Sequence, residues 1–220
     1  MCGIAGIIKK KNDKVNREEI QMMNDAMSHR GPDAEGIYID DTVGFGHRRL
    51  SIVDLSEGGR QPMFSHDRKY VLVFNGEIYN YIELKEYLKK KGAKFVTETD
   101  TEVIMEAYRF WGMNCTKKFN GMWSFALYDT VKRVVFFSRD RFGVKPLYIY
   151  ESEDEFIFAS EIKCITAIRP EQKIVDETQM ARYLAGYQED MDAHTFYKNI
   201  QNFRASYSML YQLETNTVEY

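Results

Sequence analysis

A cysteine occupies the second position of this 220-residue chain, directly after Met1. If Met1 were removed, Cys2 would carry both a thiol nucleophile and a free α-amine. Such an amine titrates near ~7.7–8.0, so it can serve as general base for the adjacent thiol at neutral pH. The alternative is that Cys2 is a small buried residue of an edge strand. Its position alone favours that alternative, so a nucleophile needs further support.

A second group of candidate residues, Asn75, Gly76 and Glu77, follows the apolar run 70–74. Hydrolysis of an amide needs hydrogen-bond donors aimed at the developing oxyanion. The Asn75 amide and the Gly76 backbone N–H could supply two donors, and a glycine lets a substrate approach closely. Asn-Gly is also the strongest dipeptide signal for a tight turn. Taken alone, the segment favours a turn that ends the strand.

Two charged residues have the chemistry to hold the ends of an amino acid. Arg49 lies in the segment 47–54, HRRLSIVD, and its planar guanidinium can bind a carboxylate through two parallel hydrogen bonds. Arg48 and Arg49 could equally form a solvated pair at a strand end, which this fragment alone favours. Asp100 could bind an ammonium group, or it could cap a helix and interact with the helix dipole. Spacing does not decide between these roles.

These residues are expected to lie on short strands and at helix starts. Alternation and β-rich composition predict strands over 2–8, 37–39, 43–53, 70–74, 123–129, 133–138, 146–150 and 155–159. Helical periodicity and end signals predict helices over 17–28, 80–91, 99–111 and 177–185. Strands outnumber helices, and the helices come in isolated pairs. The sequence therefore predicts an α+β fold in which helices cover stacked antiparallel sheets.

Two of the helices carry more specific signals. Thr99 and Glu102 form a capping box at the start of the helix over 99–111. In the helix over 80–91, the apolar positions expected to face inward are Ile82, Leu84, Tyr87 and Leu88.

Composition narrows the classes of partner. The formal net charge is -3 with the signs well mixed and no basic patch, so nucleic acid is not expected. No apolar run reaches the roughly 18–20 residues that span a bilayer, so no membrane is expected. Positive charge follows the first apolar run, the reverse of a secretory signal, which indicates a cytoplasmic chain. Cys2, Cys115 and Cys164 lack metal-binding spacing, so no metal site is expected.

Eight ordered segments resemble one known family, and together they outweigh the alternatives for each fragment. The family is the N-terminal glutaminase domain of glutamine-dependent asparagine synthetases, which are class II glutamine amidotransferases. The segments are MCGIAGI at 1–7, HRGPD at 29–33, HRRLSIVDLSEGGRQPM at 47–63, VFNGEIYNY at 73–81, TDTEVI at 99–104, FNGMWSFALYD at 119–129, RDRFGVKPLY at 139–148 and ASEIK at 159–163.

The resemblance implies a fold, a reaction and a set of site residues. The fold would be the four-layer αββα sandwich of N-terminal nucleophile (Ntn) hydrolases, with two antiparallel sheets. The reaction would be hydrolysis of glutamine to glutamate and ammonia. The family motifs imply a nucleophile and two oxyanion donors at Cys2, Asn75 (side chain) and Gly76 (backbone). They imply contacts with glutamine at Arg49 for the α-carboxylate, at Glu77 and Asp100 around the α-ammonium, and through the backbone at Leu50, Ile52 and Val53.

The resemblance also suggests how the chain is organised. It supports a type-2 glutamine amidotransferase domain over 2–195, whereas 196–220 matches the family poorly and is expected to lead to a synthetase domain absent from this sequence. No glycine-rich phosphate loop of that domain occurs here, so no cofactor is expected in this chain. ATP and Mg are expected only in the missing domain, which would use the ammonia to amidate aspartate. The alternatives are a docking or regulatory module, a different ammonia acceptor, or a stand-alone amidase for another amide.

Overall fold

Two six-stranded sheets stack face to face in the computed structural model, which describes residues 1–11, 13–51, 57–186 and 192–220. Every pair of neighbouring strands in both sheets is antiparallel. The first sheet has the order β10 (Ile200–Asn202), β8 (Tyr148–Glu151), β9 (Glu155–Ala159), β1 (Gly3–Lys9), β3 (Val43–Arg49), β2 (Ala34–Asp40). The second has the order β12 (Thr217–Glu219), β11 (Ser208–Gln212), β7 (Val134–Arg139), β6 (Gly121–Asp129), β5 (Tyr70–Ile78), β4 (Met63–Phe64).

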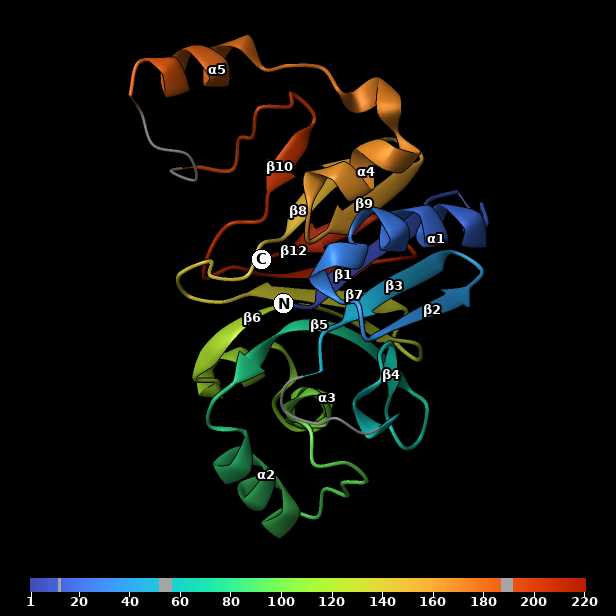
Figure 1. The fold of residues 1–220 in the computed structure, drawn as a ribbon. Helices are drawn as coiled ribbons and strands as arrows, with labels where there is room; N and C mark the ends of the chain where they lie inside the picture. Colours follow the sequence, from blue (N-terminus) through green and yellow to red (C-terminus); the bar gives the residue numbers. More distant parts are fainter. Residues whose placement is uncertain (12, 52–56, 187–191) are drawn as a thin grey trace.

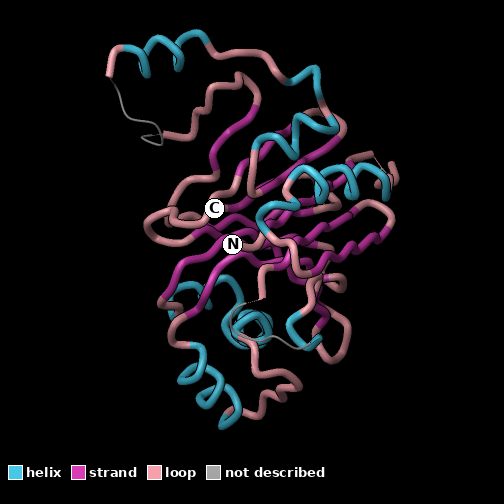
Figure 2. Tube along the Cα trace, viewed as in Figure 1, coloured by secondary structure: helices cyan, strands magenta, loops and turns pink. Residues whose placement is uncertain are grey.

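Helices cover the outer faces of both sheets (Figure 1). The first sheet is covered by α1 (Arg17–Ala26) and α4 (Ile162–Ile168), and the second by α2 (Tyr81–Lys90) and α3 (Asp100–Trp111), while α5 (Glu177–Leu184) lies beyond α4. Short 3₁₀ turns complete the described helices: η1 (Ser28–Arg30), η2 (Glu57–Gly59), η3 (Gly112–Lys118) and η4 (Pro170–Gln172). Figure 2 shows strands in the middle and helices on either side. The predicted four-layer αββα sandwich is confirmed.

The first strand shows how the sequence builds these layers. Successive side chains of a strand point to opposite faces. On β1, Ile4 and Ile8 join the apolar layer between the sheets, whereas Ala5 and Ile7 join the layer beneath α1 and α4. This strand is therefore apolar on both faces, which explains the continuous run in the sequence. The same alternation directs Cys2 toward the space between the sheets.

Local end signals place α3 as expected. Thr99 is its N-cap and accepts a hydrogen bond from the Glu102 N–H, and Gly112 follows the helix with φ 58. The predicted capping box is only half formed, because the Glu102 carboxylate accepts from the Val96 and Thr97 N–H groups and the Thr99 N–H bonds to Thr97 Oγ1. The prediction for α2 is wrong at two inward positions, because Ile82 is 59% exposed and Tyr87 is 45% exposed. This helix buries only the narrow stripe that contains Leu84 and Leu88, since it lies at the outer margin of α3.

The largest difference from the sequence prediction is in β5. The strand does not end at residue 74 but continues to Ile78, and it pairs with β6 through Asn75 opposite Ser124 and Gly76 opposite Trp123. The turn predicted for Asn-Gly is therefore wrong. A local dipeptide preference yields here to pairing with a strand that lies more than 40 residues further along the chain. Conversely, β3 ends at Arg49, four residues before the predicted end of that strand at residue 53.

Residues beyond the predicted boundary at 195 contribute to both sheets. Strand β10 pairs with β8, and β11 pairs with β7. Met209 and Tyr211 of β11 are buried in the layer between the sheets. Within the described ranges, no helix is long and apolar enough to cross a membrane, and no group of three or more His, Cys, Asp or Glu residues is arranged to hold a metal ion.

Candidate active site

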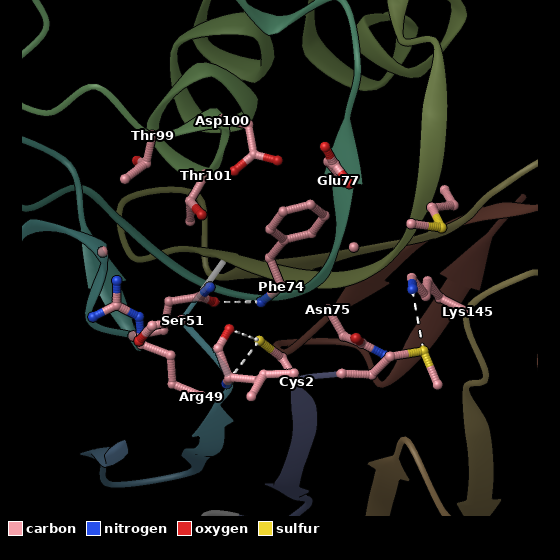
Figure 3. Close-up of a pocket in the computed structure, with 16 residues that line it drawn as sticks. Cys2, Arg49, Ser51, Phe74, Asn75, Glu77, Thr99, Asp100, Thr101 and Lys145 are labelled. Carbon is pink, nitrogen blue, oxygen red and sulfur yellow. Dashed lines mark hydrogen bonds between the residues drawn. The ribbon is translucent and has the colours of Figure 1, made fainter. Parts of the chain in front are cut away.

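Cys2 lies immediately before β1, at the edge of a pocket (Figure 3). Its Sγ accepts a hydrogen bond from the Leu50 N–H at 3.4 Å and lies 3.5 Å from the Leu50 carbonyl oxygen. Burial raises the pKa of the thiol, although the Leu50 N–H and the charges of the N-terminus and Arg49 oppose the shift. Because the group is a thiol at neutral pH, nucleophilic attack requires a base.

Strand β5 presents a backbone edge to the pocket, because β4 pairs only with its beginning. Two side chains satisfy N–H groups on this edge. Gln61 Oε1 accepts from Phe74 N at 2.6 Å, and Asp100 Oδ2 accepts from Ile78 N at 3.0 Å. Backbone N–H groups two residues apart in a strand point the same way. The Gly76 N–H, between these two, is therefore directed to the same edge.

Asn75 supplies a second donor beside Cys2 (Figure 3). The residue is 1% exposed, and its Nδ2 has no hydrogen-bond partner among the residues that the structure describes. Leaving a buried donor unpaired costs about 1–3 kcal/mol, so such a group calls for an explanation. When the Cys2 sulfur attacks a carbonyl carbon, the oxyanion that forms on the carbonyl oxygen would be an acceptor for this amide.

Gly76 is required by the close approach of β6. A Cβ atom added at this position would lie against the Met122 carbonyl oxygen and within 2.7 Å of Trp123 Cα and 2.6 Å of the Phe74 ring. No side chain fits there without moving the backbone of β6. The glycine therefore serves the strand pairing and leaves its own N–H accessible from the pocket.

Arg49 forms one wall of the pocket. The two arginines of the segment point in opposite directions, as alternation along β3 requires. Arg48 makes ion pairs of 3.1 Å with Asp25 and Glu35 on the outer side, whereas Arg49 is buried. The Arg49 guanidinium lies against Gly59, where an added Cβ would overlap it. The solvated pair is therefore wrong for Arg49.

Acidic groups form the opposite wall, with Asp100 and Glu77 across the pocket from Arg49 (Figure 3). Thr99 caps α3, and Asp100 is instead a buried first residue whose carboxylate accepts from the Ile78 N–H. Burial raises the pKa of Asp100 to about 6, and the Glu77 charge adds to this effect. The pocket thus has a cationic wall and an anionic wall, with the thiol and the amide donors between them.

Every predicted site residue that the structure describes lines this one pocket: Cys2, Arg49, Leu50, Asn75, Gly76, Glu77 and Asp100. Ile52 and Val53 lie outside the described residues. The roles proposed for these residues remain predictions, although their convergence is a finding of the structure.

Comparison with known proteins agrees with this geometry. Residues 1–220 match the model of a family described as the glutamine amidotransferase domain. The chain belongs to this family.

Relatives with curated names are longer glutamine-hydrolyzing proteins. The chain is 41% identical over 223 residues to asparagine synthetase 2 of Bacillus subtilis, covering 98% of this chain and 30% of that protein. It is 36% identical over 200 residues to asparagine synthetase B of Escherichia coli, covering 90% of this chain and 35% of that protein. The chain spans less than half the length of the curated relatives it matches.

Two solved structures share the fold of this amidotransferase domain. The glutamine phosphoribosylpyrophosphate amidotransferase of B. subtilis aligns over 99% of this chain and 49% of its own, with a TM-score of 0.73 and 17% identity. A structure described as the allosteric regulatory enzyme of purine biosynthesis aligns over 99% and 48%, with a TM-score of 0.74 and 18% identity. These likenesses support the Ntn-hydrolase sandwich.

The amidotransferase pocket is also lined by residues for which the sequence predicted no role in catalysis or in substrate binding. The additional lining residues are Met1, Ser51, Gly59, Gln61, Phe74, Thr99, Thr101, Met122 and Lys145. Lys145 Nζ lies 3.3 Å from Met1 Sδ, and burial lowers the pKa of this lysine. Gln61 and Lys145 fall inside the segments that carry the family resemblance, which was the one available signal for either residue.

Proposed function

We propose that this chain hydrolyses glutamine to glutamate and ammonia, with Cys2 as the nucleophile. The observation that carries the proposal is the buried Nδ2 of Asn75 beside the Cys2 thiol, for which the described residues supply no hydrogen-bond acceptor. A donor without an acceptor next to a nucleophile is what an enzyme needs to stabilise a charge that exists only in the transition state.

The two charged walls match the ends of a free amino acid. Arg49 binds the α-carboxylate as a fork, and Asp100 and Glu77 bind the α-ammonium group. With its pKa raised to about 6, Asp100 is still ionised at neutral pH. The backbone of Leu50, Ile52 and Val53 supplies further contacts with the substrate.

Hydrolysis proceeds through a thioester on Cys2. The α-amine takes the thiol proton, and Sγ attacks the side-chain carbonyl carbon of glutamine. The carbonyl oxygen becomes an oxyanion that accepts hydrogen bonds from Asn75 Nδ2 and the Gly76 N–H. The C–N bond then breaks, and ammonia leaves with the proton held by the amine.

A water molecule completes the cycle. It loses a proton to the same amine and attacks the thioester carbon. The C–S bond breaks, the proton returns to sulfur, and glutamate leaves. This mechanism requires removal of Met1, because the Cys2 nitrogen is otherwise an amide with no basic lone pair, and Met1 itself lines the pocket.

The ammonia is used elsewhere. We propose that an ATP-dependent synthetase domain outside this sequence receives it and amidates a carboxylate, with aspartate as the expected acceptor. The names and greater length of the relatives support this assignment. The chain itself needs no cofactor, and ATP and Mg belong to that domain. We place the protein in the cytoplasm, without a nucleic-acid or membrane partner.

The decisive experiment is an assay of the purified chain with glutamine. Glutamate and ammonia should appear in equal amounts, and Cys2→Ala should release neither. Mass spectrometry of the active protein should show a chain without Met1. If an active preparation retained Met1 throughout, the α-amine could not be the base.

A further inference from the structure

Side chains bind both the N–H and the carbonyl group of Phe74, the residue that precedes Asn75. Phe74 donates its N–H to Gln61 Oε1 at 2.6 Å, and its carbonyl oxygen lies 3.2 Å from His47 Nε2. Both groups belong to the edge of β5 that β4 leaves unpaired. Two side chains thus replace the backbone partners that a neighbouring strand would provide.

The contact made by His47 crosses from one sheet to the other. His47 lies on β3 of the first sheet, and Phe74 lies on β5 of the second. The imidazole is fully buried. Apolar side chains such as Val73 and Phe45 fill much of the layer between the sheets, and their packing is close but not directional. One other hydrogen bond between the sheets joins Tyr128 Oη of β6 to Asp40 Oδ2 of β2 at 3.0 Å. A hydrogen bond adds a fixed distance and orientation at this point.

The chemical state of His47 follows from its partner. A carbonyl oxygen can only accept, so the ring proton lies on Nε2 and the Phe74 carbonyl receives it. Burial lowers the pKa of His47 to about 3, and the nearby Arg49 charge acts in the same direction. The ring is therefore neutral at working pH. It acts as a fixed donor and does not take part in proton transfer.

The position of this bond matters because the site is divided between the sheets. Cys2 lies immediately before β1 of the first sheet, whereas Asn75 and Gly76 belong to β5 of the second. The distance from the nucleophile to the oxyanion donors therefore depends on how one sheet sits on the other. Donors stabilise an oxyanion only when they are aimed at its position before the reaction.

We propose that His47 and Gln61 are positioning residues. They hold the backbone N–H and carbonyl group of Phe74 and thereby fix the position of the Asn75 and Gly76 donors relative to Cys2. Neither residue needs to touch the reacting atoms. The inference rests on the proposed function, because a displacement of the donors is visible only in a reaction that forms an oxyanion.

The test compares His47→Leu with His47→Gln, which replaces the imidazole donor with an amide N–H of similar reach. His47→Leu should lower kcat per active site by roughly 10- to 100-fold, the range expected for a misplacement near 1 Å, with KM changed little. His47→Gln should recover most of this loss. Active sites are titrated with a cysteine-directed glutamine analogue, so that unfolded molecules do not count.

Phe45→Leu is the matched control, because Phe45 lies two residues before His47 on the same face of β3 and is fully buried. It should lower the melting temperature without changing kcat per titrated site. Gln61→Met provides an independent arm at the Phe74 N–H, and it should lower kcat in the same way as His47→Leu. It also keeps the test open if His47→Leu does not fold.

Two outcomes would overturn the proposal. Either His47→Leu or Gln61→Met could keep a normal kcat per titrated site despite a lowered melting temperature, or His47→Gln could fail to recover activity while folding normally. Failure of the proposed function looks different, because the unaltered protein would then release no glutamate at all.

Discussion

The layer between the two sheets has an apolar end and a polar end, and the same strands build both. On β5, Val73 at the apolar end is followed on the same face by Asn75. On β3, Phe45 is followed by His47. The direction of alternation does not change along either strand. The site is therefore a continuation of the core, in which polar side chains occupy the last inward positions.

The neighbouring strands β1 and β6 follow the same rule. Ile4 on β1 is preceded by Cys2, and Ala126 on β6 is preceded two residues earlier by Ser124. At the apolar end, aromatic rings pack at centroid distances near 5 Å, for example Phe137 against Phe158 at 5.0 Å. At the polar end, the atoms without a hydrogen-bond partner among the described residues include His47 Nδ1, Asn75 Nδ2 and Ser124 Oγ.

The apolar end of the layer therefore serves mainly stability, and the polar end serves mainly the reaction. Burial of apolar surface stabilises the fold, at ~25 cal/mol per Å². Buried polar atoms without partners destabilise it, and they persist where a ligand or a transition state supplies the partner. Substitutions at the polar end should therefore change activity more than stability, and substitutions at the apolar end should do the reverse.

The largest effect is expected for Cys2→Ala. Removal of the sulfur should abolish glutamate release, because no thioester can form. The melting temperature should change little, since the hydrogen-bond contacts of the thiol with described residues are long, at 3.4 and 3.5 Å to Leu50. Glutamate release and thermal melting are measured on the same preparation. Residual turnover at a comparable rate would show that another group is the nucleophile.

Asn75→Ala tests the oxyanion donor. Loss of one such donor lowers kcat by about 100- to 1,000-fold, or ~2.7–4 kcal/mol, while the binding of glutamine should change little. Stability should not fall, because Nδ2 has no partner to lose within the described structure. Asn75→Asp should be worse for catalysis, since it adds an anion beside the developing anion.

Val73→Ala is the matched control for Asn75, on the same face of the same strand. It should destabilise the protein by on the order of 2 kcal/mol and leave kcat per titrated site unchanged. If both variants instead showed a lowered melting point with normal turnover, Asn75 would have only a structural role.

Gly59→Ala tests the cationic wall without altering a charge. The added Cβ would overlap the Arg49 guanidinium, which must then move. KM for glutamine should rise by roughly 10-fold, the effect of weakening one hydrogen bond to a charged group, with a smaller change in kcat. Steady-state kinetics measure both constants.

A double-substitution cycle assigns this effect to Arg49. If Gly59→Ala acts through the guanidinium, adding it to Arg49→Lys should raise KM by much less than it does alone. Full additivity of the two substitutions would mean that Gly59 contacts the substrate independently.

The sequence predicts well what local signals determine. The Thr99 N-cap and the glycine after α3 each lie within one turn of the helix end that they specify, and the apolar periodicity of α1 lies within the helix itself. The alternating and apolar runs likewise predict the stacked sheets. The family motifs then select the residues that meet in the pocket, although no local pattern could show that they converge.

The errors arise where distant contacts override local preference. Asn75-Gly76 is a turn by its dipeptide preference but a strand in the structure, because β6 pairs with it. Arg49 has the same residue type as its half-buried neighbour Arg48, and only the face of β3 on which it falls makes it a pocket residue. The contact of His47 with Phe74 links positions 27 residues apart, so no sequence pattern indicates it.

The last prediction concerns Asp100, and it tests whether the polar end lowers stability. Burial raises the pKa of Asp100 from 3.8 to about 6 in the folded protein. Between these values the folded protein holds a proton that the unfolded chain has released, so this group's contribution to stability falls as pH rises through the window. Above pH 6 the ionised carboxylate lowers stability by on the order of 2–3 kcal/mol.

Asp100→Asn removes the charge and keeps an oxygen that can accept from the Ile78 N–H, so it should be more stable than the unaltered protein at pH 8 and equal to it near pH 4. Denaturant unfolding at pH 4, 6 and 8 measures the difference, while KM should rise because the ammonium group loses its partner. A difference that did not vary with pH would mean that Asp100 is not the group that titrates, and a loss of stability at pH 8 would mean that the carboxylate stabilises the fold.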